Sequence, residues 1–492
     1  MSGTGVSLSQ IARHTPGVVA VFEGDVLVSD ITHDSRQVGE GCIFVAIPGE
    51  QFDGHDFIDS AIKNGTSAVL VEKQQIGSMP QIVVESSRDA MPWAARAVFG
   101  FPDSSLAIAG VTGTNGKTTV THMIEAIMVS AGIPVGIIGT LGARINGASI
   151  PIARTTPEAT DLQRMLAKMR DDRVRVVLME VSSHAIELRR SDAIRFSVVG
   201  FTNLSQDHLD FHGDMETYYE VKKRLFAPSV TETAVINVGD PWGERLEGSS
   251  SVPTTTVSLN DAADIHATDL MASPMGTSFT ATTPEGSLRV VLPLAGRFNV
   301  SNALVAIGMA LGLGVELPII SRGLGRLDTV PGRMEVISHD GPFTVVVDYA
   351  HTPDAVAVVL DSVRSTVPGR VIALVGAGGD RDTDKRSSMG AAAARHSDLT
   401  IITTDNPRSE DPAAIAAEVR RGAETQPNAL IETVIDRRAA IRRGIAAAQA
   451  GDMVLVLGKG HEQGQDIATE VLPFDDRDEV RSALVEAGWV PS

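Results

Sequence analysis

The chain has a single cysteine, Cys42, so it cannot form an intrachain disulfide, and this composition is typical of a reducing compartment. It also lacks any uninterrupted apolar stretch near the ~18 residues that a membrane-spanning helix needs. Residues 1–10 have neither the charged region nor the apolar region of a secretory signal. We therefore expect a cytoplasmic protein with no membrane partner.

Positive charge is scarce as well, because 42 Lys and Arg face 61 Asp and Glu, giving a formal net charge of −19. Binding a nucleic acid requires a basic surface that neutralises phosphates, and none of the charged runs here is strongly basic. We therefore expect no nucleic-acid partner. The sequence also contains no low-complexity tract and no short-period repeat.

The length of 492 residues suggests about three domains, and loop-forming segments at 101–105 and 330–333 divide the chain accordingly. We predict domains at 1–104, 105–333 and 334–492. Short apolar runs alternate with helical patterns in the second and third pieces, which predicts α/β domains with doubly wound, mostly parallel sheets. The predicted strands include 176–179, 197–201, 233–236, 344–347, 371–375, 399–402 and 453–457.

Residues 110–119 read GVTGTNGKTT, between the apolar run 106–109 and a helical pattern over 120–131. Glycines at 113 and 116 let backbone N–H groups surround phosphate oxygens, Lys117 supplies a positive charge, and the Thr118 hydroxyl can bind Mg²⁺. The strict P-loop pattern has glycine where this chain has Val111, so the loop is a variant. The setting of strand, loop and helix nevertheless predicts a site for a nucleoside triphosphate, and hence an enzyme.

Two more side chains could bind a metal ion near this loop. Glu180 ends a predicted apolar strand, where a carboxylate is costly unless it meets a cation, and Mg²⁺ at the phosphate loop would be that cation. His208 could be a second ligand or a hydrogen-bonded loop histidine. Residues 218–226 read YYEVKKRLF, a helix whose basic residues would by themselves indicate a solvated face.

A series of motifs makes the chain resemble the Mur ligase family, in order and spacing, nearly from end to end. Within the family, three of the motifs resemble those of the members that add the third residue of the peptidoglycan peptide: HDSR at 33–36, DGH at 53–55 and DNPR at 405–408. The motifs are 33–36 HDSR, 53–55 DGH, 113–119 GTNGKTT, 155–157 TTP, 180–184 EVSSH, 203–210 NLSQDHLD, 299–302 NVSN, 348–353 DYAHTP, 405–408 DNPR and 458–462 GKGHE.

The resemblance implies a small N-terminal α/β domain that binds UDP, a central P-loop ATPase domain and a C-terminal Rossmann-like domain that binds an amino acid. It implies an ATP-dependent amide ligase that joins meso-diaminopimelate to the D-Glu γ-carboxylate of UDP-MurNAc-L-Ala-D-Glu through an acyl phosphate. ATP is a substrate and Mg²⁺, as two ions, the cofactor. We expect a monomer whose partners are these small molecules.

The resemblance also implies roles for individual residues. Lys117, Glu180, His208 and Lys222 match catalytic positions, and Thr118, Glu180, His208 and Lys222 match metal ligands. In this family the lysine at position 222 is carbamylated, which turns a cation into a carboxylate-like ligand. Lys222 is preferred to Lys223 because it lies four residues after Tyr218 and four before Phe226, as in the family.

Each substrate has its own set of matched positions. The ATP positions are Gly113, Thr114, Asn115, Gly116, Lys117, Thr118, Thr119, Asn302, Arg333, Asp348 and Tyr349, with Asn299 as a weaker candidate. The positions for the UDP-sugar and the dipeptide are His33, Ser35, Glu50, Gln51, Phe52, Thr155, Thr156, Ser182, Arg190 and Lys222. The diaminopimelate positions are Arg381, Asp405, Asn406, Pro407, Arg408, Gly458 and Glu462.

Alternatives within and outside the family are open at this point. Arg408 can bind the second carboxylate of diaminopimelate, which lysine lacks, so we expect diaminopimelate rather than L-lysine. A folylpolyglutamate synthase-like ligase shares the P-loop, but the N-terminal motifs and DNPR argue against it. An ATP-gated scaffold with a dead active site is disfavoured by the intact Lys117, Glu180, His208 and Lys222.

Overall fold

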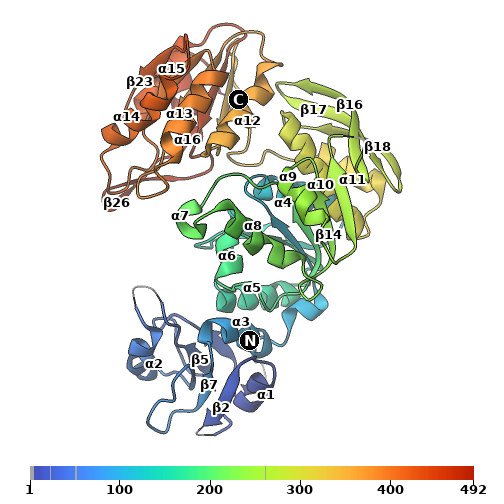
Figure 1. The fold of residues 1–492 in the computed structure, drawn as a ribbon, viewed down its shortest axis with the longest axis vertical. Coiled ribbons are helices and arrows are strands. Elements are labelled where there is room, and N and C mark those ends of the chain that lie inside the picture. Colours follow the sequence, from blue (N-terminus) through green and yellow to red (C-terminus); the bar gives the residue numbers. More distant parts are fainter. Residues whose placement is uncertain (1–4, 23, 50–51, 261, 492) are drawn as a thin grey trace.

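A computed structural model describes residues 5–22, 24–49, 52–260 and 262–491 of the chain. Three sheets, each with its own helices, follow one another along the long axis of the molecule (Figure 1). The boundary predicted at 104/105 falls in a 3-10 helix, Pro102–Ser105, between the first two sheets, and the one at 333/334 falls just before the third sheet. The exact limits of the domains stay a prediction.

The N-terminal domain is a five-stranded sheet, parallel from β4 to β7, with β2 antiparallel at its edge. The sheet order is β2 (Val18–Phe22), β7 (Gln81–Val84), β6 (Ala68–Val71), β5 (Cys42–Val45) and β4 (Asp30–Thr32). A two-stranded sheet joins β1 (Val6–Ser7) to β3 (Leu27–Val28), and the helices are α1 (Leu8–Arg13), α2 (Ile58–Lys63) and α3 (Ser87–Val98).

The central domain has an eleven-stranded sheet that is parallel from β9 to β16 and antiparallel at both ends. Its order is β11 (Ala148–Ile150), β10 (Gly142–Ile145), β9 (Val135–Gly139), β12 (Val176–Glu180), β8 (Ala107–Thr112), β13 (Phe196–Phe201), β14 (Thr231–Asn237), β15 (Thr254–Ser258), β16 (Ile265–Ser273), β17 (Gly276–Thr283) and β18 (Gly286–Leu292). The helices are α4 (Lys117–Ser130), α5 (Ala159–Asp171), α6 (Ser183–Glu187), α7 (Leu209–His212), α8 (Met215–Lys223), α9 (Pro241–Glu247), α10 (Arg297–Gly312) and α11 (Leu317–Gly325).

The C-terminal domain has a six-stranded sheet in which only the pair β19–β20 is antiparallel. Its order is β19 (Glu335–Val336), β20 (Thr344–Asp348), β24 (Met453–Leu457), β21 (Val371–Val375), β22 (Leu399–Ile402) and β23 (Ile431–Thr433), and a hairpin pairs β25 (Gly464–Ile467) with β26 (Glu470–Pro473). The helices are α12 (Pro353–Arg364), α13 (Lys385–His396), α14 (Pro412–Ala423), α15 (Arg437–Ala447) and α16 (Asp476–Glu486).

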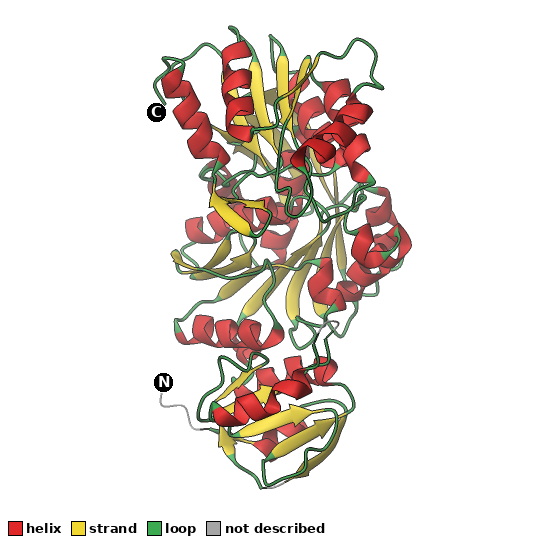
Figure 2. Cartoon of the chain, turned by 90° about the vertical axis from the view of Figure 1, so that its left-hand side faces the viewer, coloured by secondary structure: helices red, strands yellow, loops and turns green. Residues whose placement is uncertain are grey.

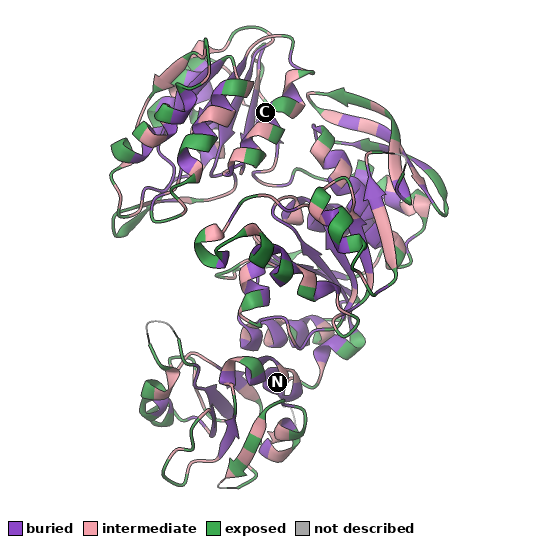
Figure 3. Cartoon of the chain, viewed as in Figure 1, coloured by how far each residue is buried: buried purple, intermediate pink, exposed green. Residues whose placement is uncertain are grey.

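The apolar runs form strands because both faces of each parallel sheet are covered by helices. Alternate residues of one strand therefore enter different cores: Ile108 packs with α5 and α8, whereas Ala109 and Val111 pack with α4 and α10. Helices lie on both sides of the strands in Figure 2, and the parallel strands in the middle of each sheet are among the most buried elements in Figure 3. This arrangement confirms the α/β fold predicted from the apolar runs.

The carboxyl ends of parallel strands carry the polar clusters of the sequence. In the central sheet β8 ends at the P-loop, β12 at Glu180 and β13 just before Asn203; these three strands are neighbours. In the C-terminal sheet the neighbours β20 and β24 end at Asp348 and just before Gly458. Ligands of open α/β sheets bind at this edge, so the topology gathers residues that lie far apart in the sequence.

A fully buried ion pair holds the C-terminal loops at this edge. The Arg437 guanidinium on α15 donates to both carboxylate oxygens of Asp476 on α16, at 2.7 and 2.6 Å. The same guanidinium donates to the carbonyl oxygens of Thr404, at 3.3 Å, and Leu457, at 2.9 Å. These carbonyls immediately precede Asp405 and Gly458, so the pair fixes two loops that carry predicted site residues.

We expect Asp476→Asn to lower the free energy of unfolding by about 3–5 kcal/mol, because it leaves the Arg437 charge buried without a counter-ion. Urea denaturation of the full chain measures this change. The matched control is Glu486→Gln, since Glu486 also lies on α16 and pairs with Arg442 on α15, but in an exposed pair. That control should change stability by less than about 1 kcal/mol. Equal effects of the two substitutions would show that burial does not determine how much the Arg437–Asp476 pair contributes to the free energy of unfolding.

Candidate active site

The P-loop has the conformation that an anion-binding loop needs. Gly116 has φ +88° and directly precedes α4, so the first N–H groups of this helix face the loop. A Cβ atom at Gly116 would lie 2.3 Å from Oδ1 of Asn302, so glycine is required here. The Lys117 ammonium donates to the carbonyl oxygens of Gly113, at 2.9 Å, and Thr114, at 2.8 Å. The strand, loop and helix predicted from residues 106–131 are confirmed.

Glu180 is a buried carboxylate, 1% exposed, beside the P-loop. Its Oε2 accepts from the Thr118 and Thr140 hydroxyls, each at 2.9 Å, and its Oε1 accepts from the backbone N–H of Thr140 at 2.9 Å. These donors are neutral, so they do not compensate the charge of the carboxylate. Oxygen atoms of Glu180 and Thr118 held this close fit a hard divalent cation.

Lys222 lies on α8 with its side chain under the P-loop and is 1% exposed. Its ammonium nitrogen is 3.1 Å from the carbonyl oxygen of Gly113, which Lys117 also contacts, and 3.4 Å from the Thr112 hydroxyl. Burial and the charge of Lys117 lower the pKa of Lys222 well below its ordinary value. Lys223 instead pairs with Glu220 at the surface, so only one of the two adjacent lysines faces the site.

His208 lies above the same loop, in a left-handed conformation with φ +55°. Its Nε2 is 3.4 Å from Oδ2 of Asp207, and burial lowers the pKa of the imidazole, which favours the neutral form that can bind a metal. Asp207 also faces the C-terminal domain, with His351 Nε2 and Lys385 Nζ each 3.9 Å from its carboxylate. Sequence reasoning missed Asp207 as a site residue, although it lies inside a quoted motif.

Among the described residues, no group of three or more His, Cys, Asp and Glu side chains is placed to hold a metal ion. The predicted ligand set contains only two residues of those types, Glu180 and His208. The other two are a hydroxyl, Thr118, and a lysine, Lys222. Such a set can complete a metal site only if the lysine becomes an anionic ligand.

A cleft of about 710 Å³ opens between the central and C-terminal domains, and both domains line it. Most of the residues predicted to bind ATP or metal line this cleft; the exceptions are Gly113, which belongs to the loop, and Lys222, whose side chain lies beneath it. Sequence reasoning did not assign roles to several further lining residues, including Thr140, Asn203, Asp207, Phe298 and His351. The predicted residues in the lining are Thr114, Asn115, Gly116, Lys117, Thr118, Thr119, Thr155, Glu180, Ser182, His208, Asn299, Asn302, Arg333, Asp348 and Tyr349.

Three of the predicted residues, Arg333, Asp348 and Tyr349, line the C-terminal side of this cleft. The Arg333 guanidinium lies 4.3 Å from the centre of the Tyr349 ring, and its Nη2 is 3.5 Å from the Thr118 hydroxyl across the cleft. The Asp348 carboxylate accepts from the backbone N–H groups of Met334, at 2.7 Å, and Ala350, at 2.8 Å. Its burial raises the pKa of Asp348, and the cationic Arg333 opposes that shift.

The residues predicted for the dipeptide follow β12 or precede α5. The Thr156 hydroxyl donates to the carbonyl oxygen of Glu180 at 2.8 Å and accepts from the Ser182 N–H at 3.2 Å, so it joins the two segments. Thr155 faces Thr140, with their hydroxyl oxygens 3.1 Å apart. Arg190 is buried and donates to the carbonyl oxygen of Thr156 at 3.2 Å. The structure thus groups these four residues beside Glu180.

A second polar cluster lies at the carboxyl edge of the C-terminal sheet. The Asn406 side chain donates to Glu462 at 2.8 Å and accepts from Lys459 at 2.8 Å, and Lys459 pairs with Glu462 at 3.0 Å. Lys459, fully buried, was not assigned by sequence reasoning. A Cβ at Gly458 would lie 2.4 Å from the buried carboxylate of Asp405. The cluster therefore packs two anions around one buried ammonium.

Two arginines flank Gly378 at the rim of this cluster. Arg408, after the buried Pro407, has φ +50° and donates to the carbonyl oxygen of Gly379 at 2.6 Å, and its Nε is 3.8 Å from Asp466. Arg381 is exposed. A Cβ at Gly378 would lie 3.1 Å from Nη1 of Arg408 and 4.0 Å from Cγ of Arg381, so both reach the same glycine.

The predicted UDP residues lie in the N-terminal domain, at the far end from the C-terminal cluster (Figure 1). His33 is 3.0 Å from the Thr160 hydroxyl of the central domain, and burial lowers the pKa of its imidazole. The carbonyl oxygen of Ser35 accepts from Asn64, and Phe52 is 70% exposed. Glu50 and Gln51 lie outside the described residues.

The fold and the cleft define a three-domain nucleotide-dependent ligase, and comparison with known proteins agrees. Family models match residues 27–108 (Mur ligase family, catalytic domain), 111–310 (Mur ligase middle domain) and 332–460 (Mur ligase, glutamate ligase domain). The chain belongs to the Mur ligase family, whose members are ATP-dependent amide ligases. No helix in the described part of the chain is long and apolar enough to cross a membrane.

Individual relatives cover nearly the whole chain. A UDP-N-acetylmuramoyl-L-alanyl-D-glutamate–2,6-diaminopimelate ligase of Streptomyces coelicolor is 43% identical over 95% of this chain and 94% of its own length. The enzyme of that name from Geobacillus thermodenitrificans is 40% identical over 98% of this chain and its full length. A solved structure of a ligase with this name has a TM-score of 0.69 and 34% identity, covering 98% of this chain and 99% of that one.

More distant structures share the fold alone. The MurF ligase of Thermotoga maritima in complex with ADP has a TM-score of 0.65 at 20% identity and covers 93% of this chain and 97% of that one. Folylpolyglutamate synthase of Mycobacterium tuberculosis, complexed with ADP and AMPPCP, has a TM-score of 0.61 at 20% identity and covers 74% of this chain and 91% of that one. Nucleotide binding thus recurs among proteins of this fold.

Proposed function

We propose that the protein uses ATP to join meso-diaminopimelate to the D-Glu γ-carboxylate of UDP-MurNAc-L-Ala-D-Glu, a step of peptidoglycan precursor synthesis. The observation that carries the proposal is the cleft itself, which is lined by Lys117 and Glu180 of the central domain, by Arg333 at the domain boundary and by Asp348 of the C-terminal domain. Both walls come from one chain, so we infer that a monomer suffices. Because the substrates are ATP and a UDP-linked precursor, we expect the reaction in the cytoplasm.

The proposed reaction proceeds through two substitutions. A γ-carboxylate oxygen attacks the γ-phosphorus of ATP, and the bond to ADP breaks, which gives an acyl phosphate. The amine nitrogen of diaminopimelate then attacks the acyl carbon, inorganic phosphate leaves, and the amine loses a proton. Carboxylate and triphosphate repel each other by about 4 kcal/mol per pair of charges at 4 Å and an effective dielectric constant of ~20. The site must therefore supply positive charge before the first bond forms.

Lys117 and the N–H groups at the start of α4 supply part of this charge, because they face the P-loop. Mg²⁺, when bound, would add Lewis-acid stabilisation of the phosphate oxygens. Thr118 and Glu180 would hold one ion, and His208 with Lys222 the second. Arg333 and Tyr349 would contact the nucleotide from the C-terminal side, together with Asn302 and Asp348, so the C-terminal domain completes the ATP site.

The burial of Lys222 supports its proposed carbamylation. A buried amine with a lowered pKa is largely neutral, and a neutral amine attacks CO₂ to form an N–C bond with release of a proton. The carbamate carries a negative charge, so it would relieve the repulsion between Lys222 and Lys117 and could bind a cation. Thus the predicted ligand set, in which Glu180 is the one carboxylate, would gain a second anionic ligand.

Lys222→Ala should lower kcat on the order of 100-fold or more, because it removes a metal ligand, and short carboxylic acids added to the mutant should restore part of the activity. Steady-state assays of ADP release measure both effects. The control is the adjacent Lys223→Ala, whose exposed side chain pairs with Glu220; it should behave as wild type. Full activity of Lys222→Ala without additives would refute the role of Lys222.

The C-terminal cluster supports the choice of diaminopimelate. Asp405 and Glu462 can accept from ammonium groups, and the Arg408 guanidinium can bind the distal carboxylate with two parallel hydrogen bonds. Lysine lacks that carboxylate and would leave the guanidinium unpaired, at a cost of about 1–3 kcal/mol. Arg381, Asn406, Pro407 and Gly458 would complete this amino-acid site.

The decisive experiment incubates the protein with ATP, Mg²⁺ and UDP-MurNAc-L-Ala-D-Glu, with meso-diaminopimelate or L-lysine in parallel, and identifies the products by mass. We expect the diaminopimelate tripeptide, with a preference over lysine of about 5- to 150-fold in kcat/KM, from the cost of about 1–3 kcal/mol of the unpaired guanidinium. Faster reaction with lysine would favour a lysine-adding ligase. Stimulation of ADP release by a folate substrate alone would favour the folylpolyglutamate alternative.

A further inference from the structure

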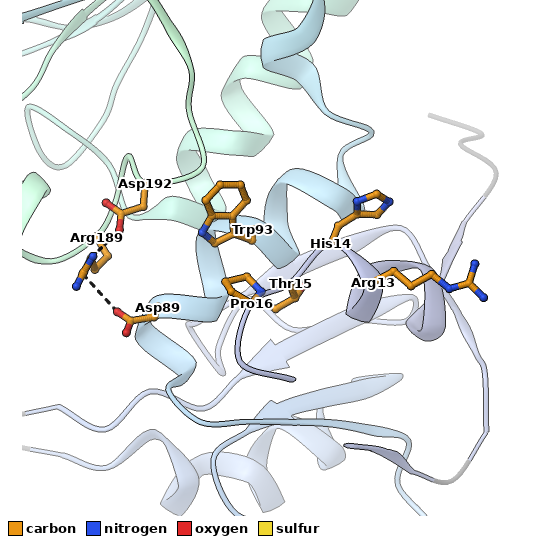
Figure 4. Close-up of a pocket in the computed structure, with 8 residues that line it drawn as sticks. All are labelled: Arg13, His14, Thr15, Pro16, Asp89, Trp93, Arg189 and Asp192. Carbon is orange, nitrogen blue, oxygen red and sulfur yellow. Dashed lines mark hydrogen bonds and ion pairs between the residues drawn. The ribbon is translucent and has the colours of Figure 1, made fainter. Parts of the chain in front are cut away.

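Ion pairs cross the boundary between the N-terminal and central domains. Asp89 on α3 is 3.4 Å from Arg189, at the rim of a pocket of about 570 Å³ that both domains line (Figure 4). Asp30 of β4 accepts from Arg164 of α5 at 2.9 Å. Both pairs are partly exposed, so each contributes little free energy.

A third pair at this boundary has a buried carboxylate, Glu158, and belongs to a larger cluster. Glu158, the residue before α5, has a side chain that is 8% exposed. Its Oε2 accepts from Arg88 of α3 at 2.9 Å, and its Oε1 accepts from Arg154 at 3.0 Å and from Arg190 Nε at 2.9 Å. The Nη2 of Arg190 is also 2.9 Å from Oε1. One carboxylate thus joins three guanidinium groups from both domains.

We propose that Glu158 is a positioning residue, which orients Arg190 for the dipeptide and couples that arginine to the UDP domain through Arg88. This inference rests on the proposed function and on the role in binding the dipeptide part of the substrate that the family resemblance implies for Arg190. The substrate would span both domains, with its UDP group near His33 and its peptide near Arg190. The orientation of Arg190 would therefore change with the position of the N-terminal domain relative to the central domain.

The charges of the cluster explain why the carboxylate is needed. Arg88, Arg154 and Arg190 all donate to atoms of one carboxylate, so their guanidinium groups would repel one another if its charge were removed. The side chain of Arg190 is 8% exposed, so water screens this repulsion poorly. An amide in place of the carboxylate keeps the shape of the side chain but not the charge. We therefore expect Arg190 to leave its position in Glu158→Gln.

The test compares two ligands on the full chain by titration calorimetry without ATP: UDP alone and UDP-MurNAc-L-Ala-D-Glu. Glu158→Gln should raise the Kd of the complete substrate about tenfold, whereas the Kd of UDP should stay within twofold of wild type. The same variant should raise KM for this substrate but leave KM for ATP within twofold. Arg88→Met, which cuts only the link to the N-terminal domain, should show the same pattern to a smaller extent.

The matched control is Asp30→Asn, which also replaces a carboxylate by an amide at this domain boundary but has no contact with Arg190. It should change neither Kd by more than twofold. The proposal is overturned if Glu158→Gln leaves the Kd of the complete substrate unchanged or lowers it, if both ligands weaken equally, or if Asp30→Asn has the same effect. Failure of the wild-type protein to bind the substrate or form the tripeptide would instead refute the proposed function.

Discussion

Repulsion between anions is the constraint on which the organisation of this protein depends. A ligase of this family must bring a triphosphate and a carboxylate together, and the residues around the P-loop are arranged to make that possible. Lys117 and the first N–H groups of α4 provide fixed positive charge. Glu180, whose donors are neutral, has a negative charge that a bound cation would compensate, whereas Lys222, buried under the same loop beside Lys117, could bind such a cation only as the proposed carbamate.

The α/β architecture meets this constraint because it places loops that are far apart in the sequence at the same edge of a sheet. β8, β12 and β13 are adjacent, so the P-loop, Glu180 and the segment that carries His208 converge although some 90 residues separate their ends. The C-terminal sheet presents its own carboxyl edge, where the buried pair of Arg437 and Asp476 holds the loops before Asp405 and Gly458. In the proposed function, the central domain would activate the carboxylate and the C-terminal domain would bind the amine, with the cleft between them.

Much of the fold follows from the sequence because parallel strands covered on both faces are continuous apolar runs. The strands predicted at 371–375, 399–402 and 453–457 have those bounds in the structure, and those predicted at 176–179, 197–201, 233–236 and 344–347 differ by one or two residues at an end. The site was harder to predict where its residues act through contacts across domains. Asp207 faces His351 and Lys385, and Glu158 accepts hydrogen bonds from three arginines. Neither set of contacts can be predicted from the spacing of these residues in the sequence. Lys222 and Lys223 look alike in sequence, and only the fold shows which one is buried.

The most direct test of the central idea follows oxygen atoms through the reaction. If the substrate carboxylate attacks ATP, then UDP-MurNAc-L-Ala-D-Glu labelled with ¹⁸O in the γ-carboxylate should transfer one labelled oxygen to the released inorganic phosphate for each amide bond formed. Mass spectrometry of the phosphate measures this directly. Phosphate with one ¹⁸O per turnover is the predicted result, and unlabelled phosphate formed together with the amide product would contradict the account.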